Sequence, residues 1–316
     1  MNKSNALTIH DMLVQDTACL IKNLHLDPDS ARIEVQCLLQ RVLIATRASL
    51  LAHPERTLSK SEQARYQHLM QRRLSGEPIA YLLGEREFFG LLFKVTPDTL
   101  IPRPETELLV ELALQRIPSH PLPASRPPSP ASGRGVGGEG EGNRQAERGE
   151  AFRVLDLGTG SGAIALTIAH ERPEIEVVAC DTSAAALDVA RENAQRLDIA
   201  NVAFVLSDWF QTFTEKRFDI IVANPPYVAA NDPHLTRGDV RFEPVIALTS
   251  GNDGLRDIRR IISQAPAHLE SGGWLLLEHG YNQAAPVREL LQQSGFVEVF
   301  SARDLAGIER VSGGRA

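Results

Sequence analysis

The chain has 316 residues, a formal net charge of −7 and 43% hydrophobic residues. This length suggests about two domains with a sizeable core, and the acidic balance argues against non-specific nucleic-acid binding, which needs a basic surface. The three cysteines, Cys19, Cys37 and Cys180, form no closely spaced pair. We therefore expect neither a disulfide framework nor a zinc site, and we expect a reducing cytoplasm as the compartment. We expect no signal peptide, and no apolar run reaches the roughly 18 residues of a membrane span.

Residues 1–84 are predicted to form a small helical bundle. One amphipathic helix is indicated by apolar residues with the spacing i, i+3, i+4, i+7 and i+8, namely Val35, Leu38, Leu39, Val42 and Leu43. Ser59 and Glu62 have the spacing of a capping box that begins a later helix. Gly76 and Pro78 are expected to end that helix.

Residues 85–117 are predicted to hold a β-hairpin and a connecting helix. Aromatic and β-branched residues flank the turn signal Gly90 within residues 86–101, which is typical of paired strands. A helix is expected to begin near Pro104, because proline is favoured in the first helical turn.

Residues 118–150 are rich in Pro, Gly and Ser and have almost no large apolar side chains. Such a segment cannot bury enough surface to offset the entropy of ordering it, so we predict a disordered insert. A docking tail is the alternative, but a tolerated surface insertion is favoured, since long loops are accommodated at little cost. Deletion of residues 119–149 is therefore expected to leave the melting temperature almost unchanged. A large decrease in a thermal melt would show that the segment is folded and packed.

Residues 151–316 alternate between apolar strands and amphipathic helices. The expected strands are 152–157, 175–180, 202–206, 218–223, 272–279 and 296–302. The expected helices are 161–172, 183–197, 254–270 and 283–294. Continuous apolar strands separated by helices indicate an α/β fold with a mostly parallel sheet covered on both faces. Ligands of such sheets bind beyond the carboxyl ends of the strands.

A glycine-rich loop, residues 156–162, follows the first of these strands. Its glycines allow a sharp turn and a close approach of the backbone to a ligand. Alone, such a loop could bind a dinucleotide, another nucleoside ligand or nothing. The second strand ends before Asp181, whose carboxylate can accept hydrogen bonds from both hydroxyls of a ribose. Its position also suits a cap of the following helix.

The loop spacing G-x-G-x-G differs from the G-x-G-x-x-G of dinucleotide sites, and Asp156 would repel a pyrophosphate. An acid at this position suits a cationic ligand. S-adenosylmethionine has a ribose, an adenine, an ammonium group and a sulfonium. After the third strand, Asp208 is placed to meet the adenine amine and Trp209 to cover the adenine face. Trp209 could equally be an ordinary core residue.

The motif Asn224-Pro225-Pro226-Tyr227 follows the fourth strand, beside the glycine loop in this topology. An amide nitrogen is a poor nucleophile because its lone pair is delocalised, so a protein assists it mainly by orientation. The Asn224 side-chain oxygen and the Pro225 carbonyl can each accept one N–H, which aims the nitrogen at a methyl donor. Tyr227 can pack on the planar amide and contact the sulfonium. A stiff turn capped by Asn224 is the alternative, which the neighbouring motifs disfavour.

Several stretches together resemble the peptide chain release factor N5-glutamine methyltransferases, the PrmC/HemK family: NPPY, DLGTGSGAIAL, LIPRPETE, GEPIAYLLGEREFFG and GDVRFEP. The resemblance covers nearly the whole chain except residues 118–150. It implies a class I S-adenosylmethionine-dependent methyltransferase fold, Rossmann-like with a seven-stranded sheet. The last strand would be antiparallel and come from residues 307–316. This catalytic domain, residues 151–316, would follow a helical substrate-docking domain, residues 1–84.

The resemblance also implies an activity and a partner. The enzyme would transfer a methyl group from S-adenosylmethionine to the glutamine of the Gly-Gly-Gln motif of class-one release factors, in support of translation termination. S-adenosylhomocysteine would be the product. The release factor would be the protein partner. The enzyme is expected to be a monomer that binds neither nucleic acid stably nor a membrane.

The resemblance also implies the site residues, each through the motif in which it lies. The cofactor-binding residues would be Asp156, Leu157, Gly158, Thr159, Gly160, Asp181, Asp208, Trp209 and Asn224. The substrate would be clamped by Asn224, Pro225, Pro226 and Tyr227, of which Asn224, Pro225 and Tyr227 are the catalytic candidates. Arg103 and Glu105 are expected to line or support the glutamine pocket, and no metal is expected.

Other functions compete with this one. The paralogous enzyme for ribosomal protein L3 also carries NPPY, but the segment HLTRGDVRFEP favours the release-factor enzyme. A nucleic-acid amino-methyltransferase is disfavoured by the acidic charge. A non-catalytic scaffold would be expected to have lost a loop glycine, Asp181 or Asn224. An NAD-linked enzyme is a further alternative, and calorimetric titration with NAD and with S-adenosylmethionine would distinguish it.

Overall fold

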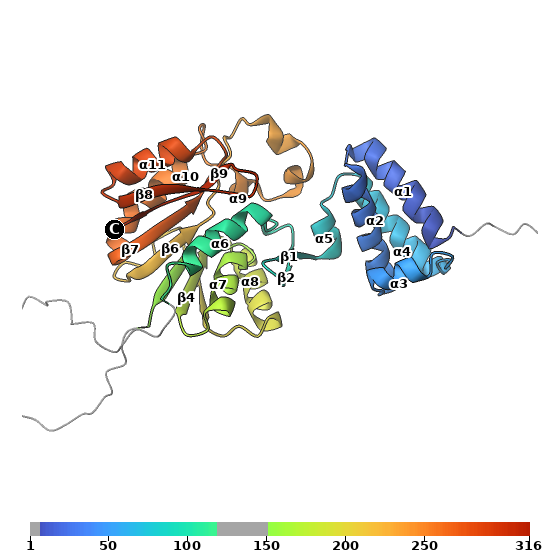
Figure 1. Cartoon of the computed structure of the whole chain (residues 1–316), viewed down its shortest axis with the longest axis horizontal. Helices are drawn as coiled ribbons and strands as arrows, with labels where there is room; N and C mark the ends of the chain where they lie inside the picture. Colours follow the sequence, from blue (N-terminus) through green and yellow to red (C-terminus); the bar gives the residue numbers. More distant parts are fainter. Residues whose placement is uncertain (1–6, 119–150) are drawn as a thin grey trace, which may run out of the picture.

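The computed structural model describes residues 7–118 and 151–316. The predicted insert lies outside the described residues except for Pro118. Figure 1 shows a helical bundle beside a larger α/β body, with a short helix and a two-stranded hairpin between them. Within residues 7–118 and 151–316, no helix combines the length and the apolar character needed to cross a membrane.

The bundle consists of helices α1 (Ile9–Leu24), α2 (Pro28–Leu43), α3 (Arg47–Ala52), α4 (Lys60–Leu74) and α5 (Ile79–Leu83). Its helices begin where the sequence supplies caps. The predicted capping box of α4 is confirmed, since Ser59 and Glu62 exchange hydrogen bonds with each other's backbone N–H groups. The predicted apolar face of α2 is buried through Val35, Leu38, Leu39 and Val42 in one core with α1 and α4.

The hairpin pairs β1 (Glu85–Phe88) with β2 (Leu91–Lys94) and is shorter than the predicted range 86–101. Phe89 and Gly90 form its two-residue turn with φ angles of 52° and 77°. Two successive left-handed residues are what a tight hairpin turn requires. Asn193 docks the hairpin onto the α/β body, because its side chain bonds both the N–H and the carbonyl of Lys94.

The sheet of the α/β body has seven strands in the order β5-β4-β3-β6-β7-β9-β8. They are β3 (Arg153–Leu157), β4 (Glu176–Asp181), β5 (Val202–Leu206), β6 (Phe218–Ala223), β7 (Leu269–Glu278), β8 (Val297–Arg303) and β9 (Glu309–Arg315). The strands from β5 to β7 pair in parallel, and β9 is antiparallel to both of its neighbours. The predicted topology, with its antiparallel last strand, is confirmed.

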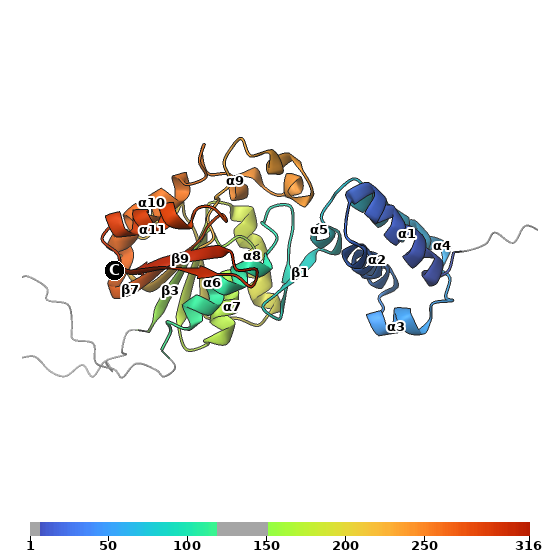
Figure 2. The same cartoon turned by 45° about the horizontal axis from the view of Figure 1, so that its top comes forward.

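Helices cover both faces of this sheet (Figure 2). They are α6 (Glu107–Leu114), α7 (Ala163–Glu171), α8 (Ala184–Arg196), α10 (Arg256–Gln264) and α11 (Ala284–Gln293), with the one-turn α9 (Val245–Leu248) in the loop after β6. Along β6, Ile220 and Val222 pack in one core with α6 and α7, whereas Ile221 and Ala223 pack in the other with α10 and α11. This alternation explains why the strand is apolar throughout.

The boundary predicted between the helix at residues 254–270 and the strand after it was wrong. The helix expected over residues 254–270 ends at Gln264, and a 3₁₀ turn, η4 (Ala265–His268), leads into β7 at Leu269 instead of residue 272. Pro266 lies in that turn and cannot continue the α-helix. Leu269 pairs with Phe218 before a register shift, so the strand begins earlier than its continuous apolar run.

A buried arginine connects the bundle to the α/β body. Arg73 of α4 is 2% exposed, and its guanidinium donates to the carboxylate of Glu34 at 2.6 Å and to that of Asp239 at 3.2 Å. Asp239 begins η3 (Asp239–Phe242), in which Arg241 donates to the Ser75 carbonyl at 2.5 Å. A single short segment of the α/β body therefore makes both contacts with the end of α4.

Candidate active site

The strands of the parallel sheet end level with one another. Leu157 at the end of β3 pairs with Cys180 of β4 and with Ala223 of β6. Ala223 in turn pairs with Leu277 of β7. The residues that follow these four strands therefore meet at one edge of the sheet, as the sequence predicted for Asp181 and Asn224.

The glycine loop turns tightly at this edge. The N–H groups of Gly158 and Thr159 both donate to the Cys180 carbonyl at 2.9 Å. Gly158 and Gly160 have φ angles of 74° and 56°, a region that favours glycine. A Cβ on Gly158 would lie 3.4 Å from the ring of Trp209, so the loop and the predicted adenine wall face each other.

Asp156 lies fully buried at the end of β3. Its Oδ2 accepts a hydrogen bond from the Thr159 hydroxyl at 2.6 Å, whereas Oδ1 has no partner among the described residues. Burial raises the pKa of Asp156 to about 7, although the bond from Thr159 opposes this change. A carboxylate with a free buried oxygen favours a cation nearby, which fits the ammonium-bearing ligand that the sequence predicts.

Asp181 connects the loop to the next helix. One carboxylate oxygen accepts from the Gly160 N–H at 2.9 Å, and the other accepts from the Ser183 N–H at 2.9 Å. Ser183 itself is the N-cap of α8. Burial raises the pKa of Asp181, and the hydrogen bonds from the backbone oppose this effect. The side chain thus supports both segments from a position beside the loop, and its role as the ribose acceptor stays a prediction.

Asn224 lies between the glycine loop and the segment that begins α6. Its side-chain NH₂ group donates to the hydroxyl of Thr106 at 3.2 Å. Thr106 is 4% exposed and ends the 3₁₀ turn η1 (Pro104–Thr106) within the motif LIPRPETE. The amide nitrogen is therefore engaged by the protein, and the amide oxygen is the atom left to accept a ligand N–H.

Tyr227 is held at both ends. Its hydroxyl donates to Oε1 of Glu278 at 3.3 Å, and its carbonyl accepts from the Gln283 side chain at 3.0 Å. Gly254 lies against the same carbonyl, where a Cβ would come within 2.2 Å of the oxygen. Burial, followed by the nearby charge of Glu278, raises the pKa of the Tyr227 hydroxyl, so this group is a hydrogen-bond donor at neutral pH.

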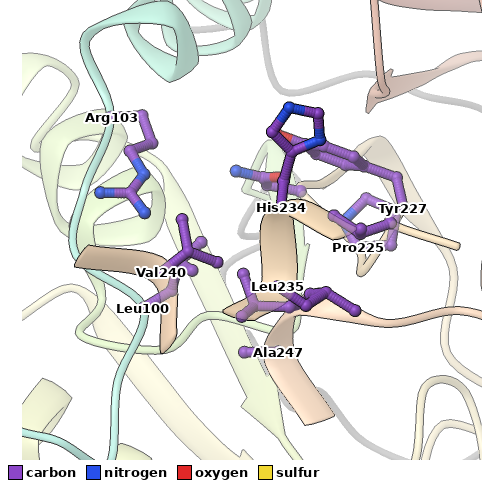
Figure 3. A pocket seen from close by; sticks show the side chains of 11 residues that line it. Leu100, Arg103, Pro225, Tyr227, His234, Leu235, Val240 and Ala247 are labelled. Carbon is purple, nitrogen blue, oxygen red and sulfur yellow. The ribbon is translucent and has the colours of Figure 1, made fainter. Parts of the chain in front are cut away.

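A pocket of about 190 Å³ opens beside Asn224 (Figure 3). It is lined by Leu100, Arg103, Asn224, Pro225, Tyr227, Val228, His234, Leu235, Val240, Ala247 and Leu248. Most of these side chains are apolar, and they come from the segment before α6, from the NPPY motif and from the loop after it. The pocket can receive a narrow side chain whose polar end reaches Asn224.

Arg103 is fixed at the pocket wall by Glu243. The Glu243 side chain is buried, ion-paired with Arg103, and accepts the Ile101 N–H at 3.1 Å. Burial raises the pKa of Glu243, and the charge of Arg103 opposes the change. Glu105 is exposed, and neither it nor Pro226 is among the residues that line the pocket. Asp208 is ion-paired with Arg260 at 2.7 Å.

Two residues of this network, Thr106 and Glu278, were missed by the sequence analysis. Glu278 is 1% exposed at the end of β7, next to Asn224 across the sheet. Its position at the end of an apolar strand was the available signal, because strand ends of this sheet carry the site. Thr106 gave no such signal, since a threonine within a helix start is an ordinary residue there.

Models of two known families match the chain. The model described as the methyltransferase small domain matches residues 145–238, and the PrmC N-terminal domain matches residues 22–84. The catalytic domain of hMettl16, solved with the MAT2A 3′UTR hairpin 6, aligns with a TM-score of 0.50 and 16% identity, over 78% of this chain and 81% of that one. The fold and the glycine loop define a class I methyltransferase of the S-adenosylmethionine-dependent type.

Curated relatives narrow this class. The release factor glutamine methyltransferase of Bordetella pertussis is 48% identical over 93% of this chain and 98% of its own length. That of Burkholderia pseudomallei is 48% identical over 90% of this chain and 91% of its own length. The chain therefore belongs to the release factor glutamine methyltransferase family.

Proposed function

We propose that this protein transfers a methyl group from S-adenosylmethionine to the side-chain amide nitrogen of the glutamine in the Gly-Gly-Gln motif of class-one release factors. The observation that carries the proposal is the position of Asn224, which lines a mostly apolar pocket one strand away from the glycine loop and whose NH₂ group is already engaged by Thr106. The family membership of the chain supports the same reaction.

The protein's own contribution to this reaction is orientation. The Asn224 oxygen and the Pro225 carbonyl accept the two N–H groups of the substrate amide, so that its nitrogen faces the methyl donor. Tyr227 supports the plane of the amide from a fixed position. S-adenosylmethionine supplies the methyl group from its sulfonium and leaves as S-adenosylhomocysteine.

The residues around the loop fit this cofactor. Asp181 would accept from the ribose hydroxyls, and the glycine loop, residues 156–160, would pass close to the ligand because its glycines add no Cβ. Trp209 would cover the adenine, with Asp208 or its backbone near the adenine amine. The unpartnered oxygen of Asp156 favours the positive charge of the methionine ammonium group.

The bundle within residues 1–84 is proposed to dock the release factor. The bundle contacts η3 of the α/β body through Arg73 and Ser75. The same short segment carries Val240, which lines the pocket. A monomer working in the cytoplasm, where release factors act, is the expected form of the enzyme.

Mass spectrometry of a purified release factor after incubation with the protein and S-adenosylmethionine tests the proposal. We expect one added methyl group on the Gly-Gly-Gln peptide. Labelling of ribosomal protein L3 instead would assign the chain to the paralogous activity. Labelling of neither protein would overturn the proposed function and favour a nucleic-acid substrate or a scaffold.

The Asp181→Ala substitution is expected to weaken binding of S-adenosylmethionine. A hydrogen bond to a charged acceptor contributes roughly 1.5–3 kcal/mol, so the loss of even one should raise the Kd by about 10- to 150-fold in a calorimetric titration. Asp188→Ala is the control, because Asp188 lies on α8 with a 76% exposed side chain. An unchanged Kd with a lower melting temperature would leave Asp181 only the role of a structural cap.

A further inference from the structure

Behind the NPPY motif lie two buried polar contacts. Thr106 accepts from the Asn224 NH₂ group, and Glu278 accepts from the Tyr227 hydroxyl. Glu278 lies beside Asn224 across the sheet, because Ala223 pairs with Leu277, and the Thr106 hydroxyl lowers the pKa of its carboxylate. Thr106 and Glu278 are 4% and 1% exposed, so neither can exchange its partner for bulk water.

We propose that Thr106 and Glu278 are positioning residues that fix which end of the Asn224 amide faces the substrate. An asparagine amide has a donor end and an acceptor end of nearly equal shape, and its orientation depends on its partners. Only the acceptor end can receive the N–H of a substrate amide. A reversed Asn224 would present a second NH₂ group to the substrate and repel it.

The charge on Glu278 decides this orientation. An ionised carboxylate is only an acceptor, so it attracts the hydrogen of the Thr106 hydroxyl. The oxygen of Thr106 can then only accept, and the group it accepts from is the Asn224 NH₂. The second carboxylate oxygen, Oε2, is buried without a hydrogen-bond partner among the described residues, so it is free to accept from the Thr106 hydroxyl.

The surroundings of Glu278 bring the protonation of its carboxylate into the neutral pH range. Burial raises the pKa of Glu278 to about 7, Thr106, Tyr227 and Arg310 lower it, and Glu105 raises it. The neighbouring His279 is turned away, towards the Ser312 hydroxyl at 2.8 Å. While the carboxylate is charged, Thr106 is held as an acceptor. Once Glu278 is protonated it can donate, and Thr106 is then free to turn its hydrogen towards the Asn224 oxygen.

The inference rests on the proposed function, and its test separates the two. Thr106→Val removes the hydroxyl at nearly constant volume, and Thr106→Ser restores it. Loss of one hydrogen bond should lower kcat for methyl transfer by about 10-fold with the KM for S-adenosylmethionine unchanged, and the serine variant should recover most of the rate. Thr167→Val is the control, since Thr167 is equally buried but bonds the Ala163 carbonyl within α7.

The pH profile gives the second readout. In the wild type, kcat should fall as the pH decreases through about 7. Glu278→Gln carries an amide that can always donate, so its kcat should be low at every pH and show no such transition.

The third readout does not depend on enzyme activity. The NMR signal of the Asn224 side-chain NH₂, identified by its loss in Asn224→Asp, should shift in Thr106→Val and return in Thr106→Ser.

An unchanged NMR signal in Thr106→Val, or wild-type kcat in that variant, would overturn the positioning role. If the wild-type protein methylates no release factor but the NMR signal responds as expected, the proposed function fails and the orientation of Asn224 by Thr106 stands.

Discussion

Asn224→Ala is expected to reduce methyl transfer to the glutamine by roughly 100-fold or more, the usual effect of losing a group placed to stabilise developing charge. Binding of S-adenosylmethionine should remain nearly intact, because the loop hydrogen bonds of Gly158, Thr159 and Gly160 do not involve Asn224. Single-turnover kinetics with the release factor and calorimetry with the cofactor measure the two effects separately.

Asn231→Ala provides the matched control, because Asn231 follows the same motif but is exposed. Its rate should equal that of the wild type. Weakened cofactor binding with unchanged turnover in Asn224→Ala would contradict the substrate-clamp role and leave Asn224 as a cofactor contact or as the cap of a stiff turn.

Arg73→Ala is expected to destabilise the protein by about 3 kcal/mol or more, since removing one partner of a buried ion pair leaves the other charge uncompensated. Glu34, with only 12% of its side chain exposed, would lose the partner at 2.6 Å. Urea unfolding followed by circular dichroism measures the change. Arg72→Ala is the control, because Arg72 is the preceding residue but its side chain is 40% exposed. Its pair with Glu77 should contribute at most about 1 kcal/mol.

Arg73→Ala also tests the contact between the bundle and the pocket wall. Asp239 loses its bond to Arg73, and the neighbouring Val240 lines the pocket. We therefore expect the KM for the release factor to rise more than the KM for a short Gly-Gly-Gln peptide.

Equal free energies of unfolding for Arg73→Ala and Arg72→Ala would show that the buried pair contributes little to stability.

The fold and the edge of the sheet that carries the site were predictable because their signals are local. Continuous apolar strands gave the parallel sheet, and the rule that ligands bind at carboxyl strand ends selected Asp156, Asp181 and Asn224. The helix over residues 254–270 was drawn too long, because the pairing of Leu269 with Phe218 is a tertiary contact that competes with the local pattern.

The contacts of the polar groups behind Asn224 could not be predicted in the same way, although the position of Glu278 at the end of an apolar strand was a local signal. Thr106 lies 118 residues before its partner, and Glu278 lies 51 residues after Tyr227. Thr106 carries no signal of its own in the sequence, and the role of both residues depends on contacts between separate elements. Such a relation is defined only once α6 and β7 are packed beside β6.

The course of α6 has a practical consequence. The helix begins beside Asn224 and ends at Leu114, and β3 then enters the sheet at Arg153 and runs back to the glycine loop. Residues 118 and 151 therefore flank the edge of the sheet opposite the active site. A fluorescent protein or an affinity tag inserted between them would sit far from the candidate active site, so this position offers an attachment point for reporters of substrate binding.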